Sequence, residues 1–224
     1  MRVGRSRVAA AAPYLQVAPL AAVLGVFLVF PIALIAVVSF WDYTEYALIP
    51  DFTFRNYWEL FSSVVTYKTY LSTLRFAAIT WAVTLVVGFT VAYFLAFHVR
   101  TLKWQMTLFL VCTIPFWTSN IIRMISWIPV LGRNGLVNAA LLKTGVVSAP
   151  VEWLLYSDFA VVLAMVHLYT LFMVTPIFNT LMRIDRSLIE AARDAGANAW
   201  QVLWNVVLPL AKPGMAIGTI FVVT

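Results

Sequence analysis

Residues 190–209 read EAARDAGANAWQVLWNVVLP, a polar helical pattern in a chain whose other long segments are almost entirely apolar. Of the 224 residues, 63% are hydrophobic and 11% are charged, whereas globular proteins are about half apolar and about a quarter charged. Several apolar runs reach about 20 residues, which is long enough to cross a hydrocarbon core of about 30 Å. The composition therefore predicts a membrane protein in which residues 190–209 lie outside the bilayer.

The apolar runs predict membrane spans at residues 13–40, 71–97, 106–131 and 158–182, and a further apolar stretch begins at Pro213. The first run follows three arginines and has no small-residue cleavage site, so we expect a retained span and not a signal peptide. The stretch after Pro213 is too short to cross a bilayer, so we expect the chain to stop within a fifth span and to lack a sixth. The predicted fold class is all-α, a polytopic transmembrane helical bundle.

The distribution of lysine and arginine predicts the orientation, because cytoplasmic loops retain these residues. With the N-terminus inside, the cytoplasmic segments hold nine of them: Arg2, Arg5, Arg7, Arg100, Lys103, Arg183, Arg186, Arg193 and Lys212. The outer loops hold four: Arg55, Lys68, Arg133 and Lys143. We therefore predict a cytoplasmic N-terminal segment over residues 1–12, a membrane domain over 13–224 and a cytoplasmic loop over 183–212.

Several functions are disfavoured by the motifs that the sequence lacks. It has no Gly-rich phosphate-binding loop, no HExxH and no paired Cys/His spacing, so we expect no nucleotide hydrolysis, no cofactor and no metal. Cys112, the single cysteine, lies in the third predicted span, where we expect it to pack. The basic residues are dispersed, and the net charge of +6 follows from topology, so we expect no nucleic-acid partner.

Local signals predict two short helices in the cytoplasmic loop. Ser187 and Glu190 have the spacing of a capping box, which predicts that a helix begins at Ser187. Gly196 can adopt the left-handed conformation that ends a helix. Asn198 predicts the start of a second helix, and we expect Pro209 to end it. The pattern also allows an amphipathic segment lying on the bilayer surface.

The spacing in this loop resembles the EAA loop of the membrane subunits of bacterial ABC importers, EAA-x3-G-x9-I-x-LP. Six of the seven marked positions match, and the usual isoleucine is Val206: the matching residues are Glu190, Ala191, Ala192, Gly196, Leu208 and Pro209. The resemblance implies that the loop is a coupling helix seated in a groove of a separate ATP-hydrolysing subunit. It also implies the fold of a type I ABC importer permease.

Two further segments are similar to the spermidine/putrescine branch of these permeases. They are PFWTSNIIRMISWIPVLGRNGLVN at residues 115–138 and LFMVTPIFNTLMRIDRSLIEAARDAGA at residues 171–197. The resemblance implies a bacterial inner-membrane permease subunit that imports a polyamine and works with a second permease subunit, a dimer of ATP-binding subunits and an external solute-binding protein. An importer of opines or amino-acid derivatives remains open. So does a secondary transporter without an ATPase, although no intramembrane carboxylate relay supports it.

Five residues are candidates for the translocation pathway: Trp117, Arg123, Trp127, Tyr169 and Phe172. A charged guanidinium near mid-bilayer costs about 2.5–3.5 kcal/mol on insertion scales, so we expect Arg123 to face inward. It would line the pathway, or bond to helix carbonyls or to a carboxylate of a partner subunit. The four aromatic rings would attract an ammonium group, or serve only in packing.

Other polar and small residues in the spans carry weaker expectations. We expect His167 to form a hydrogen bond between helices and Arg75 to extend to the interface. Gly88 and Ala92 form a small-xxx-small pair that permits close helix contact. Between residues 132 and 158 we expect a short interfacial helix on the outer side. We expect helix interruptions at three prolines: Pro115, Pro129 and Pro176.

Overall fold

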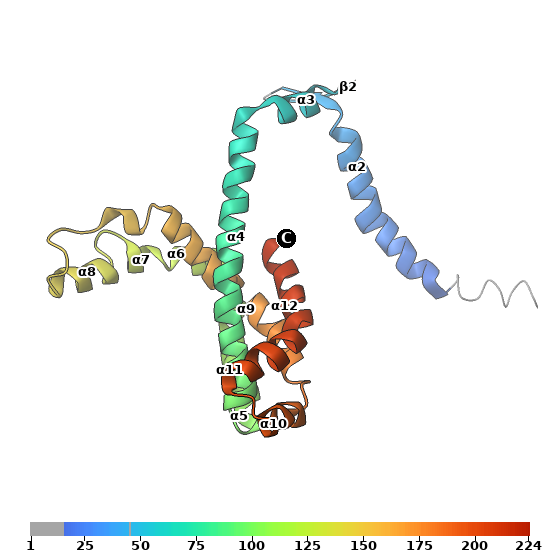
Figure 1. The fold of residues 1–224 in the computed structure, drawn as a ribbon. Helices are drawn as coiled ribbons and strands as arrows, with labels where there is room; N and C mark the ends of the chain where they lie inside the picture. The colour runs from blue at the N-terminus through green and yellow to red at the C-terminus, as the bar shows by residue number, and fades with distance from the viewer. Residues whose placement is uncertain (1–15, 45) are drawn as a thin grey trace, which may run out of the picture. The chain divides into compact units, whose positions relative to one another are not determined.

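The computed structural model describes residues 16–44 and 46–224, so the predicted N-terminal segment 1–12 lies outside the described residues. The chain divides into two compact units, Met1–Tyr70 and Leu71–Thr224, which are described separately below. Within the described residues, four helices are long and apolar enough to cross a membrane, and a bent helix pair would make a fifth span. Figure 1 shows these elements along the chain.

The first unit begins with the helix Gln16–Val38, which contains a π-helical turn over Gly25–Val29 and ends with α2 (Phe30–Val38). Neither of these segments has a buried residue. A helix that is apolar on every side is suited to a lipid environment. The first predicted span is confirmed from Gln16 onward.

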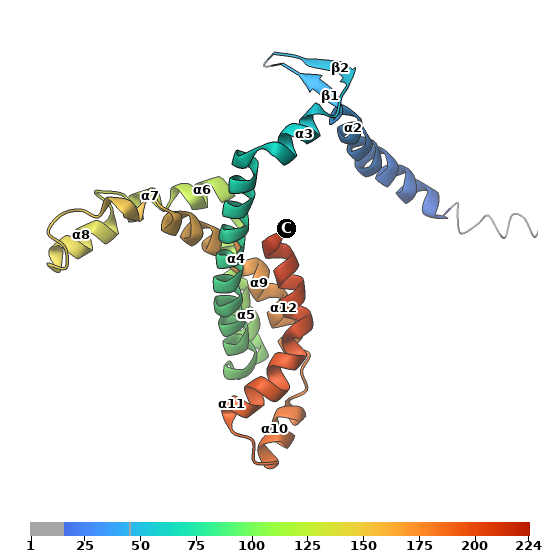
Figure 2. The same ribbon diagram turned by 45° about the horizontal axis from the view of Figure 1, so that its top comes forward.

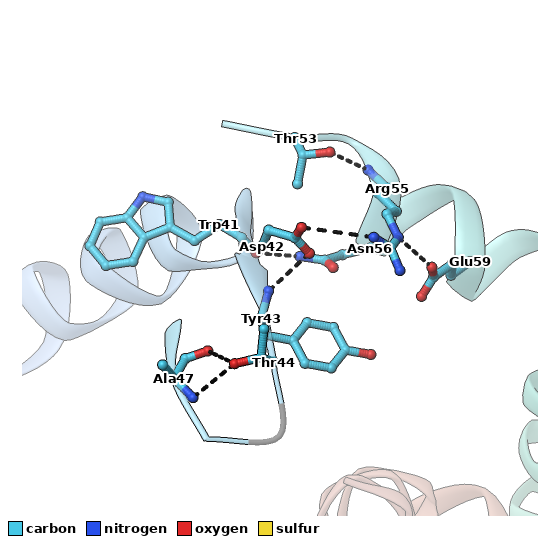
Figure 3. A network of polar contacts seen from close by, with 9 residues as sticks. All are labelled: Trp41, Asp42, Tyr43, Thr44, Ala47, Thr53, Arg55, Asn56 and Glu59. Atoms are coloured by element: carbon cyan, nitrogen blue, oxygen red, sulfur yellow. Dashed lines mark hydrogen bonds and ion pairs between the residues drawn. The ribbon is translucent and has the colours of Figure 1, made fainter. Parts of the chain in front are cut away.

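A short hairpin follows the first span, which the all-α prediction did not include. Strands β1 (Trp41–Tyr43) and β2 (Leu48–Phe52) pair antiparallel, with Tyr43 opposite Leu48. Thr44 closes the turn, since its backbone N–H donates to the Ala47 carbonyl over 2.9 Å, and Figure 3 shows its side chain against the same residue. Helix α3 (Arg55–Ser62) comes next.

The second and fourth predicted spans are confirmed as long helices. Helix α4 (Val64–Tyr93) continues through a π-helical turn to form one helix over Val64–His98. At its end, the buried Gln105 side chain donates to the carbonyls of Ala96 and Val99, both over 3.0 Å. Helix α9 (Asp158–Leu181) coincides with the fourth prediction.

The third predicted span, residues 106–131, was wrong as a single helix. Helix α5 (Leu102–Thr113) tightens into a 3-10 turn at Ile114–Trp117, and helix α6 (Asn120–Ile125) starts after an extended residue, Thr118. The two halves are bent by 92°. The chain has no regular helix at this break because Pro115 lacks a backbone N–H and Thr118 has an extended backbone.

Beyond the break, short helices replace the end of the predicted span. Helix α7 (Ile128–Leu131) starts with Pro129 in its first turn, and α8 (Leu136–Lys143) is the short helix expected between residues 132 and 158. The fully buried Asn138 ties α8 down by donating to Gly132 and Val151 carbonyls and accepting from the Val151 N–H over 2.7 Å.

The last helix corrects the expectation about Pro209. Residues Ala199–Val223 form one helix: α11 (Ala199–Val202), a π-helical turn at Leu203–Val207 and α12 (Leu208–Val223). Pro209 therefore does not end the second loop helix, because the wider π turn before it shifts the carbonyls with which its ring would clash. The loop and the final apolar stretch are thus joined in one rod.

Helices α9 and α12 form the tightest pair of the second unit, and both views show them side by side (Figures 1 and 2). A Cβ atom on Gly214 would lie 2.6 Å from the Pro176 carbonyl oxygen, and one on Gly218 would lie 2.5 Å from the Met173 sulfur. Pro176 lies within α9 without ending it, contrary to expectation. Small residues permit this close approach of two backbones.

Helix α4 joins this pair through small and polar residues. Gly88 and Ala92 are buried, and a Cβ on Gly88 would lie 2.7 Å from the Met173 Cγ, which confirms the predicted close contact. The Trp81 indole donates to the Thr219 hydroxyl of α12 over 2.9 Å. The core of the unit therefore lies where α4, α9 and α12 meet.

Arg75 has a partner that the sequence did not suggest. Its guanidinium lies 2.6 Å from the Asp158 carboxylate at the start of α9. Both side chains are 60% exposed, so the pair contributes little in water. The expectation that Arg75 extends to the interface stays a prediction, and the ion pair adds a partner on α9.

Candidate functional site

The first helix of the loop begins earlier than the sequence suggested. Helix α10 (Arg186–Asp194) is capped by Asp185, whose carboxylate accepts from the Ser187 N–H over 2.9 Å. The predicted capping box of Ser187 and Glu190 was therefore wrong: Ser187 already lies in the helix, so its N–H is satisfied by Asp185. Hydrogen bonds from the Ser187 backbone and side chain lower the pKa of Asp185.

Gly196 ends α10 as predicted. Its φ of +87° is left-handed, which costs a residue with a Cβ about 1–2 kcal/mol. The Ala197 N–H donates to the Ala192 carbonyl over 3.0 Å, and the Gly196 N–H donates to the Arg193 carbonyl over 2.8 Å. These two bonds form a Schellman motif, which sets the direction in which the chain leaves the helix.

The second loop helix begins as the sequence predicted. The Asn198 side chain accepts from the Gln201 N–H, and the Gln201 side chain accepts from the Asn198 N–H, both over 2.9 Å. This reciprocal capping box satisfies two N–H groups at the start of α11. Because α11 continues into α12, the loop has a fixed connection to the membrane helix.

The α10–α11 hairpin has one face packed on the core and one face open. Ile189 and Ala192 of α10 pack against the core, and Val202 of α11 is only 3% exposed. Ala191 and Trp200 are exposed. Of the two alanines in the EAA motif, one therefore supports the hairpin from within and the other is open to a partner.

Glu190 lies in a small polar pocket of about 170 Å³ between the hairpin and the end of α4. Arg186 and Arg193 line the same pocket, one helical turn before and after Glu190 on α10. Arg186 also donates to the Ala96 carbonyl over 3.5 Å. Glu190 therefore lies between two guanidinium-bearing side chains and does not serve as part of a helix cap.

A second candidate site is an aromatic cavity of about 710 Å³ between α5, α9 and α12. Phenylalanine and tryptophan rings alternate with hydroxyl and amide groups around it, and Arg183 is its one charged lining residue. The lining residues are Phe109, Thr113, Phe116, Trp117, Leu171, Phe172, Thr175, Pro176, Asn179, Thr180, Arg183, Ile217 and Phe221. Cavities of this size, mostly apolar with a few polar groups, are typical of small-molecule sites.

Only two of the five predicted pathway residues line this cavity. Phe172 and Trp117 do, with the Phe172 ring 5.4 Å from Phe116 and 6.2 Å from Phe221. Tyr169 lies beside Phe172, at 6.1 Å between ring centroids, but outside the lining. The prediction missed the polar residues Thr175, Asn179 and Arg183, although an amide at residue 179 within an apolar span was a visible signal.

Arg123 and Trp127 lie away from this cavity. Arg123 faces inward as predicted, being 7% exposed, and it donates to the Asn120 side chain. Trp127 meets His167 edge to face at 5.7 Å. The His167 Nδ1 has no hydrogen-bond partner within the described chain, and its visible contact is this ring contact. The structure does not bring these residues together with Phe172.

No metal centre accompanies either site within the part of the chain that the structure describes, where no three His, Cys, Asp or Glu side chains gather suitably. Helices long and apolar enough to span a membrane, an aromatic cavity and a capped hairpin continuous with one of these helices define a helical membrane protein. A crystal structure of a bacterial alginate ABC transporter, in complex with an alginate pentasaccharide-bound periplasmic protein, shares the fold, with a TM-score of 0.74 and 19% identity over 96% of this chain and 72% of that one. The chain belongs to the family of binding-protein-dependent transport system inner membrane components, whose model matches residues 108–224.

Two relatives refine this assignment. The spermidine/putrescine transport system permease protein PotB of Escherichia coli K12 is 30% identical over 76% of this chain and 61% of that protein. The PotB of Haemophilus influenzae is 39% identical over 41% of this chain and 32% of that protein. The matched stretch thus spans less than two thirds of either relative. The predicted polyamine-permease resemblance and the permease fold are both confirmed.

Proposed function

We propose that the chain is a membrane subunit of an ATP-driven importer that translocates a small solute, with polyamines as the favoured substrate class. The observation that carries the proposal is the α10–α11 hairpin, which is rigidly capped at both helix starts and continuous with α12. Force applied to its open face reaches the α9–α12 pair through one helix. The similarity to spermidine/putrescine permeases supports the substrate class.

The proposed orientation places the N-terminus and the hairpin in the cytoplasm, following the charge distribution. There the exposed Ala191 and the neighbouring Glu190 would meet an ATP-binding subunit, with Gly196 holding the bend. A dimer of such subunits, a second permease subunit and an external solute-binding protein would complete the assembly. Leu208 and Pro209 would act by joining the hairpin to α12.

The aromatic cavity is the proposed solute contact of this subunit, with Trp117 and Phe172 in its lining. Rings would attract an ammonium group by about 0.5–2 kcal/mol each. The lining contains no carboxylate, so the acidic partners of a polyamine would come from the second permease subunit. The same observation favours a second candidate, an importer of an anionic or zwitterionic solute held by Arg183.

Uptake measurements separate these possibilities. Labelled spermidine uptake, with and without the ATP-binding subunit, should require that subunit, and excess putrescine should compete while an amino acid or opine should not. Glu190→Lys should abolish uptake while leaving membrane insertion intact. Asp194→Lys, with the same charge change one turn along α10, is the matched control and should reduce uptake less. Uptake without an ATP-binding subunit would contradict the proposal.

A further inference from the structure

Helix α3, between the first two spans, is amphipathic, and the transport proposal gives its apolar face no role. Phe54, which precedes it, and Trp58 and Phe61 within it are spaced by four and three residues and so share one face. Their exposed fractions are 66%, 76% and 66%. Large rings exposed on one stripe are unfavourable in water and mark a contact surface.

The opposite face of α3 is occupied by polar contacts with the hairpin, which Figure 3 shows. The Asn56 amide donates to the carbonyls of Ser39 and Trp41, over 3.1 and 2.7 Å. Arg55 lies 2.7 Å from Glu59 and 3.8 Å from Asp42. The charged groups are therefore held on the hairpin side, and the stripe is left without charge.

Both ends of α3 are attached to the ends of spanning helices. At its start, the Tyr57 and Ser39 hydroxyls lie 2.6 Å apart, and the Phe40 ring lies 5.5 Å from Phe54; Ser39 and Phe40 directly follow α2. At its end, Ser63 alone separates α3 from α4, and the Tyr67 hydroxyl of α4 donates to the Phe61 carbonyl over 2.7 Å.

These attachments bear on the level of the stripe along the membrane normal. Because α3 is tied to the end of one candidate span and to the first turns of the next, we expect it to lie at the boundary between hydrocarbon and headgroups. Tyr67 and Tyr70, 58% and 60% exposed on the first turns of α4, match the aromatic belt that marks this level. An amphipathic helix there buries its apolar face about 5–10 Å into the boundary.

We propose that α3 is an interfacial membrane anchor, with Phe54, Trp58 and Phe61 inserted among lipid acyl chains and the hairpin held on the water side. The anchor would keep the β1–β2 hairpin at a fixed height above the outer bilayer surface. This role goes beyond transport, and the partner of the aromatic stripe is the lipid surface.

Environment-sensitive labels test the anchor in the assembled permease complex. In a Cys112→Ala background, Trp58→Cys and Phe61→Cys place an NBD fluorophore on the stripe, and Glu59→Cys places it on the opposite face as the matched control. In phosphatidylcholine vesicles, labels at 58 and 61 should show blue-shifted emission, quenching by brominated acyl chains and protection from iodide. The label at 59 should show the reverse.

The unmodified complex gives a second readout that needs no variant. With photoactivatable acyl chains in the vesicle, mass spectrometry should find lipid adducts on Trp58 or Phe61 and none on Glu59. Equal iodide quenching at the three labelled positions overturns the anchor. Protection of 58 and 61 only after a solute-binding protein is added also overturns it and makes the stripe a protein docking surface. Neither result depends on transport.

Discussion

Helices α10 and α3 are both short amphipathic segments outside the spans, but most of the residues that they expose differ in kind. The α10 helix turns Ile189 and Ala192 toward the core and leaves mostly small and charged residues open, with Leu188 as the apolar exception. In contrast, α3 turns Arg55 toward Asp42 of the β1–β2 hairpin and exposes Trp58 and Phe61. A small, polar open face suits a protein partner, whereas an aromatic one suits a lipid boundary.

The largest effect should come from changing the bend of the hairpin. Gly196→Val should nearly abolish transport, because a β-branched residue at φ of +87° carries about 1–3 kcal/mol of backbone strain. A Cβ there meets no atom within 4 Å, so the effect is conformational and not steric. Gly196→Asn, which tolerates this backbone, should keep most of the uptake. Equal uptake by both variants would contradict a role for the bend.

A second change tests whether the hairpin acts through α12. Gly214→Ala should separate α12 from α9, because its Cβ would lie 2.6 Å from a backbone carbonyl, and overpacking costs about 1–3 kcal/mol. A lower melting temperature in detergent and slower uptake are expected. Gly25→Ala in the first span, where a Cβ meets nothing within 4 Å, is the control and should change neither. Loss of stability in both variants would show a general glycine effect.

The corresponding change in the other region is Asn56→Leu. It removes two hydrogen bonds, one to Ser39 at the end of α2 and one to Trp41 of β1, each worth about 0.5–1.5 kcal/mol, so α3 should detach and be cleaved faster by protease. Transport should fall less than with Gly196→Val, because the α10–α11 hairpin is unchanged. Ser62→Ala, on the same helix, should leave cleavage unchanged. A cleavage rate like that of the unmodified chain would refute the attachment.

The smallest effect concerns acid sensitivity at the start of α10. The pKa of Asp185 is lowered in the folded chain, so its contribution is full above the unfolded value of about 3.9 and is lost as the pH falls through the folded pKa. Amide exchange in α10 should therefore rise only at strongly acidic pH. Asp185→Asn keeps a good cap and should remove this rise. An acid-induced rise that persists in the variant would place the titration elsewhere.

Residues with local effects were predictable from the sequence. Gly196 and the Asn198 cap act through their nearest neighbours along the chain, so the bend and the start of α11 follow from local rules. The length of the apolar runs likewise predicted three of the spanning helices: Gln16–Val38, Val64–His98 and α9. The predicted start of α10 was Ser187, whereas the helix begins at Arg186, because Asp185 and Ser187 can both cap a helix.

Features that depend on distant residues were not predictable. The partner of Arg75 lies far along the chain, and the interruption predicted at Pro115 did not give the size of the 92° bend. Gly214 and Gly218 show the small-xxx-small spacing in the sequence, but the sequence does not say that α9 packs against them or how closely. The cavity needs three helices together, so its lining was not predictable: residue type made Trp117 and Phe172 pathway candidates, and Asn179 was not among them.

The rod formed by Ala199–Val223 has a mechanical consequence. At 1.5 Å per residue, the tight contact with α9 at Gly214 lies about 21 Å along the helix from Trp200. A helix held at this contact would pass a displacement at Trp200 on to Ile217 and Phe221, which line the cavity. The chain would thus carry a motion of the α10–α11 hairpin to the cavity.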